Sequence, residues 1–272
     1  MFSTINSGEL RVTVNSLGAE LWAVQAIVPG GEETECLWDG SGGHWPRRAP
    51  LCFPWCGRLE GDYFEHAGRK YPGGGHGFAR DLEHELTASS ADSVTYRLAW
   101  PGDGGRWPWA FELSTAHRVE GRTLITECSA VNRSSEAMPA QLGFHPGFRC
   151  PMTPGGVPQD CLVRFERPEL PGGTDVFRLD EDVFDNDSIC FERIESEWVQ
   201  LEERATGRYI RVRTAGFPFV LLWSQPKIPG FVCIEPWLGY PGPGHDLARR
   251  PGARLLEPGE SISASLMITF AV

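Results

Sequence analysis

Residues 231–237 read Phe-Val-Cys-Ile-Glu-Pro-Trp, an apolar run that ends in a carboxylate, a proline and a tryptophan. An apolar run of this length bounded by a proline predicts a buried strand. A carboxylate at the end of a buried strand loses its hydration, which raises its pKa toward the range where it exchanges protons near neutral pH. An ion pair with a buried arginine is the alternative for a lone glutamate. Glu235 is therefore a candidate whose role depends on its neighbours.

Two histidines lie in similar apolar and turn-rich settings. His145 belongs to Gly-Phe-His-Pro at 143–146, and His76 begins His-Gly-Phe-Ala-Arg at 76–80. The proline after His145 favours an extended backbone at that residue. A single histidine is more often a structural hydrogen-bonding group than a catalyst, so each is a candidate and neither is assigned from its own surroundings.

The segment 44–59 combines prolines with large apolar side chains. Its three prolines at positions 46, 50 and 54 exclude a regular helix or a central strand. An irregular segment with aromatic side chains is typical of a pocket wall. Arg58 near its end is either a surface charge or a fixed, inward-pointing group, and its place after Pro54 and Gly57 favours the inward position.

The rest of the chain alternates between apolar and polar residues in short runs, which 32 glycines and 22 prolines separate. This pattern predicts many strands joined by turns, and no window has helical periodicity. No linker or repeat divides the chain, so we expect one all-β domain over residues 1–272. The expected strands are two between 3 and 28, closed by Pro29-Gly30-Gly31, then 85–89, 93–100, 111–119, 123–132, a hairpin over 197–212, 217–223, 231–237 and 261–272.

The formal net charge of −11 argues against a nucleic-acid surface and disfavours anionic membranes. No apolar run is long enough to cross a bilayer, and no secretory signal is visible. The eight cysteines are then expected to be reduced thiols in the cytoplasm. Cys52 and Cys56 lack a second close pair at zinc spacing, so no structural zinc site is expected.

An acidic stretch at 180–187 precedes a short apolar run. It lacks the ligand spacing and glycine of an EF-hand, which disfavours a calcium loop. Most of these carboxylates are expected to be solvated, whereas Asp187, next to the apolar run, is a candidate to face a site.

Several phrases together resemble the aldose 1-epimerase (galactose mutarotase-like) family, and most closely its LacX-like branch. Their order along nearly the whole chain makes the set specific, although each phrase alone is weak. The matching phrases are Gly18-Ala19-Glu20-Leu21, the segment 45–58, His76-Gly77-Phe78-Ala79-Arg80-Asp81, Phe144-His145-Pro146, Phe184-Asp185-Asn186-Asp187, Leu222-Trp223-Ser224, Cys233-Ile234-Glu235-Pro236-Trp237 and Leu256-Glu257-Pro258-Gly259-Glu260.

The resemblance implies a large, mostly antiparallel β-sandwich with few short helices and a sugar cleft. It also implies interconversion of the α and β anomers of a free aldose, with Glu235 as base and His145 as acid. No metal or organic cofactor is implied. Carried over motif by motif, the sugar-binding residues are His76, Arg58 and Asp187, and Trp237 is a candidate for packing against the sugar, like Trp45 and Trp223.

Two alternatives stay open beside the free-sugar epimerase. One is the same reaction on a sugar 6-phosphate, for which Arg47, Arg48 and Arg80 lie near the motifs. The other is a non-catalytic carbohydrate-binding protein on the same fold. The expected partner is a small sugar, with no nucleic acid or membrane, and the chain is expected to be a monomer or a homodimer.

Overall fold

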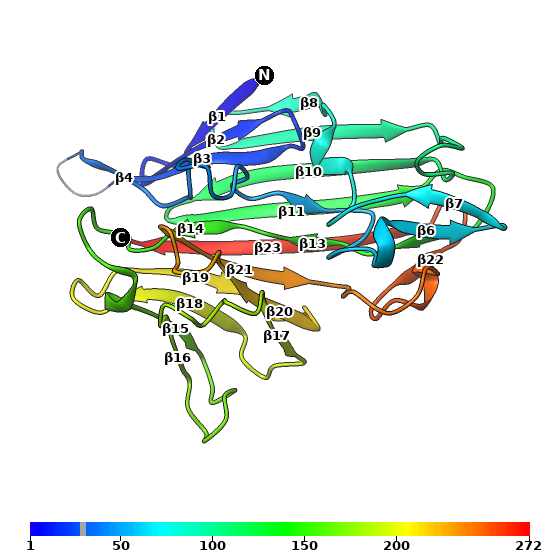
Figure 1. The fold of residues 1–272 in the computed structure, drawn as a ribbon. Coiled ribbons are helices and arrows are strands. Elements are labelled where there is room, and N and C mark those ends of the chain that lie inside the picture. Colours follow the sequence, from blue (N-terminus) through cyan, green and yellow to red (C-terminus); the bar gives the residue numbers. More distant parts are fainter. Residues whose placement is uncertain (28–30) are drawn as a thin grey trace.

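A computed structural model describes residues 1–27 and 31–272 of the chain. Almost all of its regular structure is β-strand (Figure 1). The strands are β1 (Phe2–Asn6), β2 (Leu10–Asn15), β3 (Glu20–Ile27), β4 (Glu33–Glu35), β5 (Leu51–Cys52), β6 (Tyr63–His66), β7 (Arg69–Pro72), β8 (Glu85–Ser89), β9 (Ser93–Trp100), β10 (Phe111–Glu120), β11 (Thr123–Asn132), β12 (Met138–Ala140), β13 (Gly143–Phe144), β14 (Gly147–Arg149), β15 (Cys161–Phe165), β16 (Val176–Arg178), β17 (Ile189–Glu192), β18 (Trp198–Glu203), β19 (Tyr209–Arg213), β20 (Phe219–Trp223), β21 (Phe231–Trp237), β22 (Arg254–Leu256) and β23 (Ser261–Ala271). The helices are short 3₁₀ turns: η1 (Glu60–Asp62), η2 (Ala79–Asp81), η3 (Pro158–Asp160) and η4 (Leu247–Arg249).

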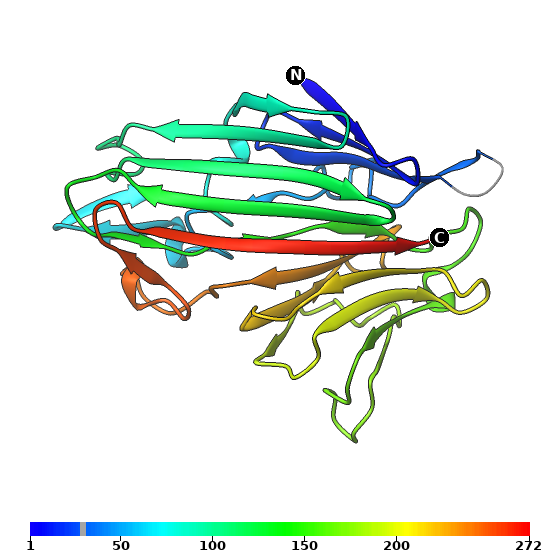
Figure 2. The same cartoon turned by 180° about the vertical axis from the view of Figure 1, so that it is seen from behind.

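The largest layer is a nine-stranded sheet in the order β16-β15-β18-β19-β23-β11-β10-β9-β8. Seen from behind, its long strands cross the molecule side by side, with β23 in red next to β11 in green (Figure 2). Along β10, buried positions alternate with partly exposed ones over nine successive residues. This period of two is the pattern of a sheet with one face on the core and one toward solvent. The alternation predicted β8, β9 and β11 with the bounds found.

A six-stranded sheet lies on the other side of the core. Its order is β17-β20-β21-β13-β5, and β14 pairs with the same edge of β21 as β13 does. The first four strands form a separate sheet in sequence order, and β6-β7 and β12-β22 are two-stranded ribbons. All the strand pairs in these sheets are antiparallel. The prediction of a mostly antiparallel β-sandwich with few short helices is confirmed.

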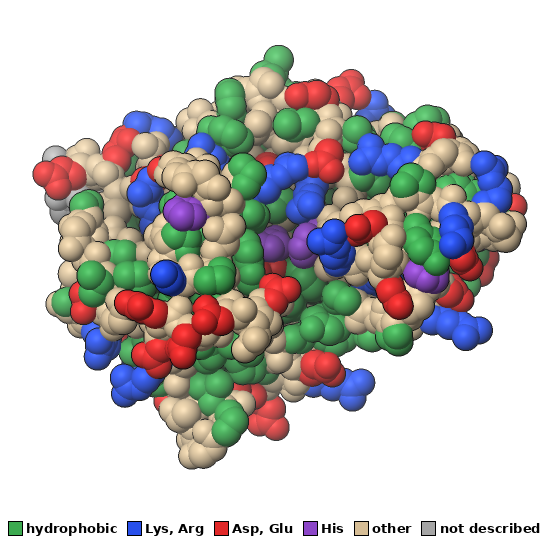
Figure 3. Space-filling model, viewed as in Figure 1, with side chains coloured by type: hydrophobic (Ala, Val, Ile, Leu, Met, Phe, Trp, Pro, Cys, Tyr) green, Lys and Arg blue, Asp and Glu red, His purple; other side chains and the backbone are tan. Residues whose placement is uncertain are grey.

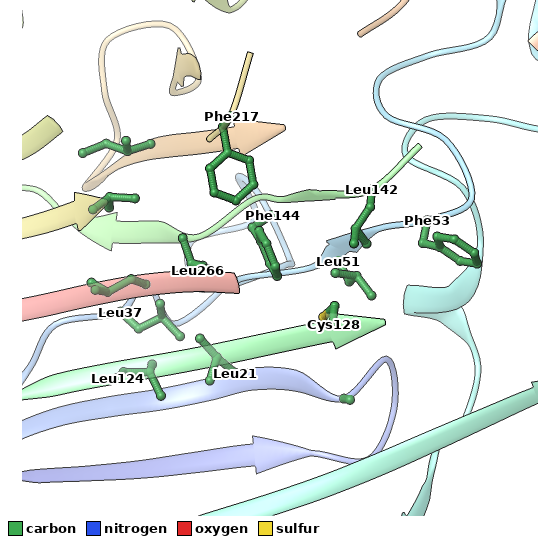
Figure 4. Packing of buried hydrophobic residues seen from close by; sticks show 14 of the residues in the cluster. Leu21, Leu37, Leu51, Phe53, Leu124, Cys128, Leu142, Phe144, Phe217 and Leu266 are labelled. Carbon is green, nitrogen blue, oxygen red and sulfur yellow. The ribbon is translucent and has the colours of Figure 1, made fainter. Parts of the chain in front are cut away.

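The main hydrophobic core fills the space between these layers. Figure 4 shows Leu124 and Cys128 of β11 together with Leu266 of β23, from the nine-stranded sheet. Phe144 and Leu51 approach them from the six-stranded sheet. All five side chains are at most 5% exposed. Their burial fixes the six-stranded sheet, and therefore the residues on its far face, relative to the rest of the chain.

Several predicted boundaries need correction. The first 27 residues hold three strands rather than two, because β1 pairs along its whole length with β2. The β6-β7 hairpin and the β15-β16 pair were not predicted, because their short runs are interrupted by charged residues. Val28, Pro29 and Gly30, which belong to the predicted closing turn, lie outside the described residues. Within the described residues, no helix has the length and apolar character to cross a membrane.

Candidate active site

The strand β21 presents different residues to its two faces. Val232 and Ile234 point into the main core. The alternate residues lie on the opposite face, where Cys233 joins an aromatic cluster and Trp237 a second apolar cluster. Glu235 lies between Cys233 and Trp237 on this face, because side chains alternate along a strand. Loops cover the face, so all seven residues of β21 are buried, as the sequence predicted.

An interruption in the neighbouring strand places His145 next to Glu235. Gly143 of β13 pairs with Trp237, and Gly147 of β14 pairs with Cys233. The same register puts His145 directly opposite Glu235, at the gap between β13 and β14. A proline follows each of these two residues and cannot donate a backbone hydrogen bond to the ladder. The two prolines therefore fit where pairing stops, and the two functional side chains face the same way.

The side chains of Glu235 and His145 are close and deeply buried. Nε2 of His145 lies 3.2 Å from Oε2 of Glu235, and the residues are 6% and 1% exposed, respectively. Among the described residues, neither carboxylate oxygen of Glu235 nor Nδ1 of His145 has a hydrogen-bond partner. Buried polar groups are normally satisfied, so this pair is an exception that calls for a ligand or a chemical role.

Burial shifts the pKa values of Glu235 and His145 in opposite directions. Loss of hydration raises the pKa of Glu235 well above its ordinary value, and the nearby Cys52 and Asp187 add to the rise. Loss of hydration lowers the pKa of His145 well below its ordinary value, and the nearby His76 and Arg80 contribute to the fall. Both shifts favour the uncharged forms of the two side chains.

His76 lies beside this pair, with its ring 5.1 Å from that of His145. The backbone N–H of Gly57 donates to Nδ1 of His76 at 3.1 Å, and the Cys52 thiol lies 3.3 Å from the same nitrogen. Nδ1 is therefore an acceptor, which fixes the proton of the neutral ring on Nε2. His76 has a φ of 64°, and Gly77 follows with a φ of 69°. Such a strained backbone is often retained at functional positions.

The three residues border one cavity with a volume of about 430 Å³. Its wall also includes Trp45, whose ring stacks on His145 with centroids 4.9 Å apart, and Trp223. The volume and the mixture of aromatic and polar groups are typical of a small-molecule site. On the face drawn in Figure 3, histidine and Lys or Arg side chains gather around a hollow near the centre.

The other predicted site residues reach the same cavity in different ways. Trp237 lines it with its ring, while its indole N–H donates to the Phe144 carbonyl at 3.1 Å. Asp187 lies at the exposed rim in a left-handed conformation, with a φ of 79°. Arg58 also borders the cavity, but its side chain is 78% exposed and forms two hydrogen bonds with Asp62. In this structure Arg58 does not hold the inward position that its sequence context favours.

Arg80 is a partly buried arginine that borders the cavity. Its Nη2 donates to the Gly75 carbonyl at 2.8 Å, and its buried Nε has no partner among the described residues. From the sequence, Arg80 is a candidate only as a phosphate ligand, although it closes the His-Gly-Phe-Ala-Arg phrase that begins with His76. Arg47 and Arg48 do not border the cavity. They hydrogen-bond instead to Asp81 and to the Trp22 carbonyl, respectively.

One group of described residues has the donor atoms for a metal ion. His145, Cys233 and Glu235 each offer one donor atom within 4.8 Å of the other two. An imidazole, a thiol and a carboxyl are all zinc ligands. Two of its three members are the close pair of Glu235 and His145.

Comparisons with known proteins support the same view of the fold. A family model described as "Aldose 1-epimerase" matches residues 1–269. The plasmid-encoded protein LacX of Lactococcus lactis subsp. lactis is 28% identical over 258 residues, which cover 85% of each chain. A galactose mutarotase related enzyme from Lactobacillus acidophilus superposes with a TM-score of 0.89 at 28% identity, over 100% of this chain and 98% of that one. A galactose mutarotase-like protein from Lactobacillus casei has a TM-score of 0.88 at 23% identity, over 99% and 100%. The chain therefore belongs to the aldose 1-epimerase family.

Proposed function

We propose that the chain is an aldose 1-epimerase that interconverts the α and β anomers of a free aldose. The observation that carries the proposal is the buried pair of Glu235 and His145, 3.2 Å apart at one cavity and without other partners among the described residues. A carbohydrate-binding protein needs no such pair, because hydroxyl groups are bound by satisfied donors and acceptors.

The reaction requires one base and one acid. Glu235 as carboxylate takes the proton of the C1 hydroxyl, and protonated His145 gives a proton to the ring oxygen. The bond from C1 to the ring oxygen breaks as the C1 carbonyl forms. Rotation about the C1–C2 bond presents the other face of the carbonyl, and closure returns both protons. Positioned acid–base groups of this kind accelerate reactions by roughly 10²–10⁴-fold.

The carboxyl proton can pass between Glu235 and His145. This exchange suits a reaction that runs in both directions. Burial favours the neutral carboxyl and the neutral imidazole, and transfer of the carboxyl proton to Nε2 of His145, 3.2 Å away, gives the carboxylate and imidazolium that ring opening uses. Both states of the pair are neutral overall, so the transfer brings no net charge into the buried site. The residues thus switch between acid and base roles as the sugar opens and closes.

The neighbouring residues supply sugar contacts. The Nε2–H of His76 is the donor for the ring oxygen or an adjacent hydroxyl, because Nδ1 is occupied by the Gly57 N–H. Asp187 at the rim accepts from hydroxyl groups, and Arg80 donates from the wall. Trp237 offers an apolar surface for the ring carbons. These roles extend the proposal to the substrate-binding residues.

Epimerisation of a sugar 6-phosphate is a second candidate. Arg58 and Arg80 are two cations that border the cavity, and the Nε of Arg80 lacks a partner among the described residues. Against this, Arg58 is engaged by Asp62, and the cavity also contains the carboxyl groups of Glu235 and Asp187. We favour the neutral sugar, because a phosphate dianion would have to approach these carboxyl groups.

Polarimetry separates these functions. Freshly dissolved α-anomers of glucose, galactose and glucose 6-phosphate are followed with and without the protein. We expect faster relaxation for at least one free aldose, with a smaller acceleration for the phosphate. His84→Asn provides a control, because His84 is a buried histidine away from the cavity and the variant should retain the rate.

A larger acceleration for glucose 6-phosphate than for either free aldose would support the phosphate activity in place of the free-sugar activity. Sugar binding measured by calorimetry without any acceleration would establish a non-catalytic binding protein and overturn the proposal.

A further inference from the structure

We propose that the chain also binds one zinc-class divalent cation beside the cavity, through the imidazole of His145, the thiolate of Cys233 and the carboxylate of Glu235. This site goes beyond the proposed epimerase activity, which needs no metal. It rests on the geometry of β21 and of the gap between β13 and β14.

The backbone brings the three ligands together. Cys233 and Glu235 are two residues apart on β21 and therefore lie on the same face of the strand. The register places His145 opposite Glu235 across the gap between β13 and β14. One donor atom of each residue lies within 4.8 Å of the other two. Side-chain rotation would bring groups within this separation to the roughly 3.5 Å between ligands of one tetrahedral zinc ion.

The separation of His145 and Glu235 is also compatible with common ligation of one ion. Their closest atoms are 3.2 Å apart, yet neither carboxylate oxygen of Glu235 accepts a hydrogen bond from the described residues. Two ligands of a tetrahedral zinc ion, each about 2.0–2.2 Å from the metal, are roughly 3.4 Å apart. The zinc–sulfur bond is longer, about 2.3 Å. Sγ of Cys233 lies within 4.8 Å of the donor atoms of His145 and Glu235.

The charges of the ion and its ligands also balance at this buried site. On binding, the thiol of Cys233 and the carboxyl of Glu235 release their protons to solvent, while the neutral imidazole of His145 binds through a lone pair. One thiolate and one carboxylate then neutralise a dication, so the occupied site has no net charge. A neutral site avoids the large cost of burying an isolated ion.

The ligand set determines which ions fit. A thiolate and an imidazole favour Zn²⁺, Co²⁺ or Cd²⁺ over Mg²⁺ or Ca²⁺, which prefer oxygen ligands. Three protein ligands leave a fourth position open toward the cavity. The ion would be coordinated by the atoms of Glu235 and His145 that exchange protons with the sugar. Under the proposed function it therefore acts as an inhibitor rather than a cofactor.

The test uses Co²⁺ as a spectroscopic probe and requires no activity. The full chain is stripped of metal, kept reduced and titrated with Co²⁺. We expect one equivalent to bind, with visible bands of tetrahedral cobalt and a near-ultraviolet band for charge transfer from thiolate to cobalt. Cys233→Ser should remove the charge-transfer band and weaken binding at least ten-fold.

Cys190→Ser is the matched control. Cys190 lies on the same row of the sheet as Glu235, because Cys190 pairs with Leu221 and Leu221 pairs with Glu235. It is not part of the three-residue group, so its substitution should leave the cobalt spectrum unchanged. If circular dichroism shows that Cys233→Ser does not fold, Glu235→Gln replaces it and should weaken binding to a similar extent.

Two results would overturn the site. One is a wild-type spectrum without the thiolate band, and the other is equal cobalt binding by wild type, Cys233→Ser and Glu235→Gln. Neither result bears on the epimerase, because the polarimetric assay is made without metal. Conversely, a chain without epimerase activity that gives the expected spectra would keep the metal site and lose only the proposed function.

Discussion

Two buried histidines, one in each large sheet, show how the same residue type serves different purposes. His117 on β10 of the nine-stranded sheet bonds Thr126 through Nδ1 and the Ala19 carbonyl through Nε2, at 2.8 and 2.9 Å. His145 in the six-stranded sheet has an unpartnered Nδ1, as far as the described residues go, and an Nε2 that faces Glu235. Both are at most 6% exposed. Burial alone therefore does not identify a functional histidine.

The difference lies in the backbone around them. β10 pairs with β11 through ten successive residues and with β9 through eight, so His117 belongs to an unbroken ladder. His145 lies where pairing along β21 is interrupted between β13 and β14. The continuous sheet satisfies its polar groups and stabilises the fold. The interrupted sheet leaves polar groups free for a ligand, at a cost in stability.

The largest expected effect concerns the tight turn that carries His76. A Cβ at Gly77 would contact the Phe53 carbonyl and lie 2.6 Å from the nitrogen of Pro54, and the residue has a positive φ. Gly77→Ala should therefore reduce the free energy of unfolding by roughly 3 kcal/mol through strain and crowding. Urea unfolding measures this change.

Gly74→Ala is the control for this turn, because its Cβ would meet no atom within 4 Å. We expect a change within about 0.5 kcal/mol, as for ordinary surface positions. Equal effects of the two substitutions would show that the turn around His76 is not held by close backbone packing.

The second prediction compares the two histidines directly. His117→Asn removes a ring bonded at both nitrogens and should cost about 2 kcal/mol of stability with little change in epimerase rate. His145→Asn should cost less than about 1 kcal/mol, because it removes an unsatisfied group. Denaturant unfolding checks the stabilities and polarimetry the rates. A larger stability loss for His145→Asn would contradict the contrast between the sheets.

The third prediction concerns the pH dependence of stability. The pKa of Glu235 is raised in the folded chain, so the folded state keeps a proton that the unfolded state loses above about pH 4.3. Its contribution to stability therefore falls as pH rises from there to the folded pKa, by up to about 1.4 kcal/mol per pH unit. Glu235→Gln should remove this fall and become relatively more stable than wild type toward neutral pH. Parallel profiles for the two proteins, measured by urea unfolding, would refute the shift.

The smallest effect is expected at the rim of the cavity. Asp187→Asn should raise KM by about five-fold with a smaller change in kcat, because a rim residue binds substrate and transition state alike. The neighbouring Asp185 is also exposed but does not border the cavity, so Asp185→Asn should match wild type. Initial polarimetric rates at several sugar concentrations measure both constants. A fall in kcat alone would assign Asp187 a different role.

The long strands were predictable from the sequence because their side chains alternate over many residues. β9 and β11 were predicted with the bounds found, and β21 was recognised as buried along its whole length. The hairpin β6-β7 escaped prediction, since its strands have four residues each and carry charged side chains. Local patterns of that length do not distinguish a hairpin from a loop.

The acid–base pair was expected from motifs, but its geometry could not be read from the sequence. Glu235 and His145 are 90 positions apart in the chain, and only the register of β21 against β13 and β14 shows that they are opposite each other. The side-chain direction of Arg58 depends on its ion pair with Asp62, four residues later. The prolines and aromatic residues of the segment 44–59 do not reveal this ion pair. The partly buried position of Arg80 likewise follows from tertiary packing rather than from its local sequence.

The most direct test of the central claim is the initial rate of α-glucose or α-galactose relaxation, whichever the wild type accelerates, with Glu235→Gln and His145→Asn. We predict that each variant loses about 100-fold or more of the acceleration while its urea midpoint stays near or above that of wild type. Folded variants that retain the wild-type rate would contradict the claim that these two residues, opposite each other at the gap in the six-stranded sheet, exchange protons with the sugar.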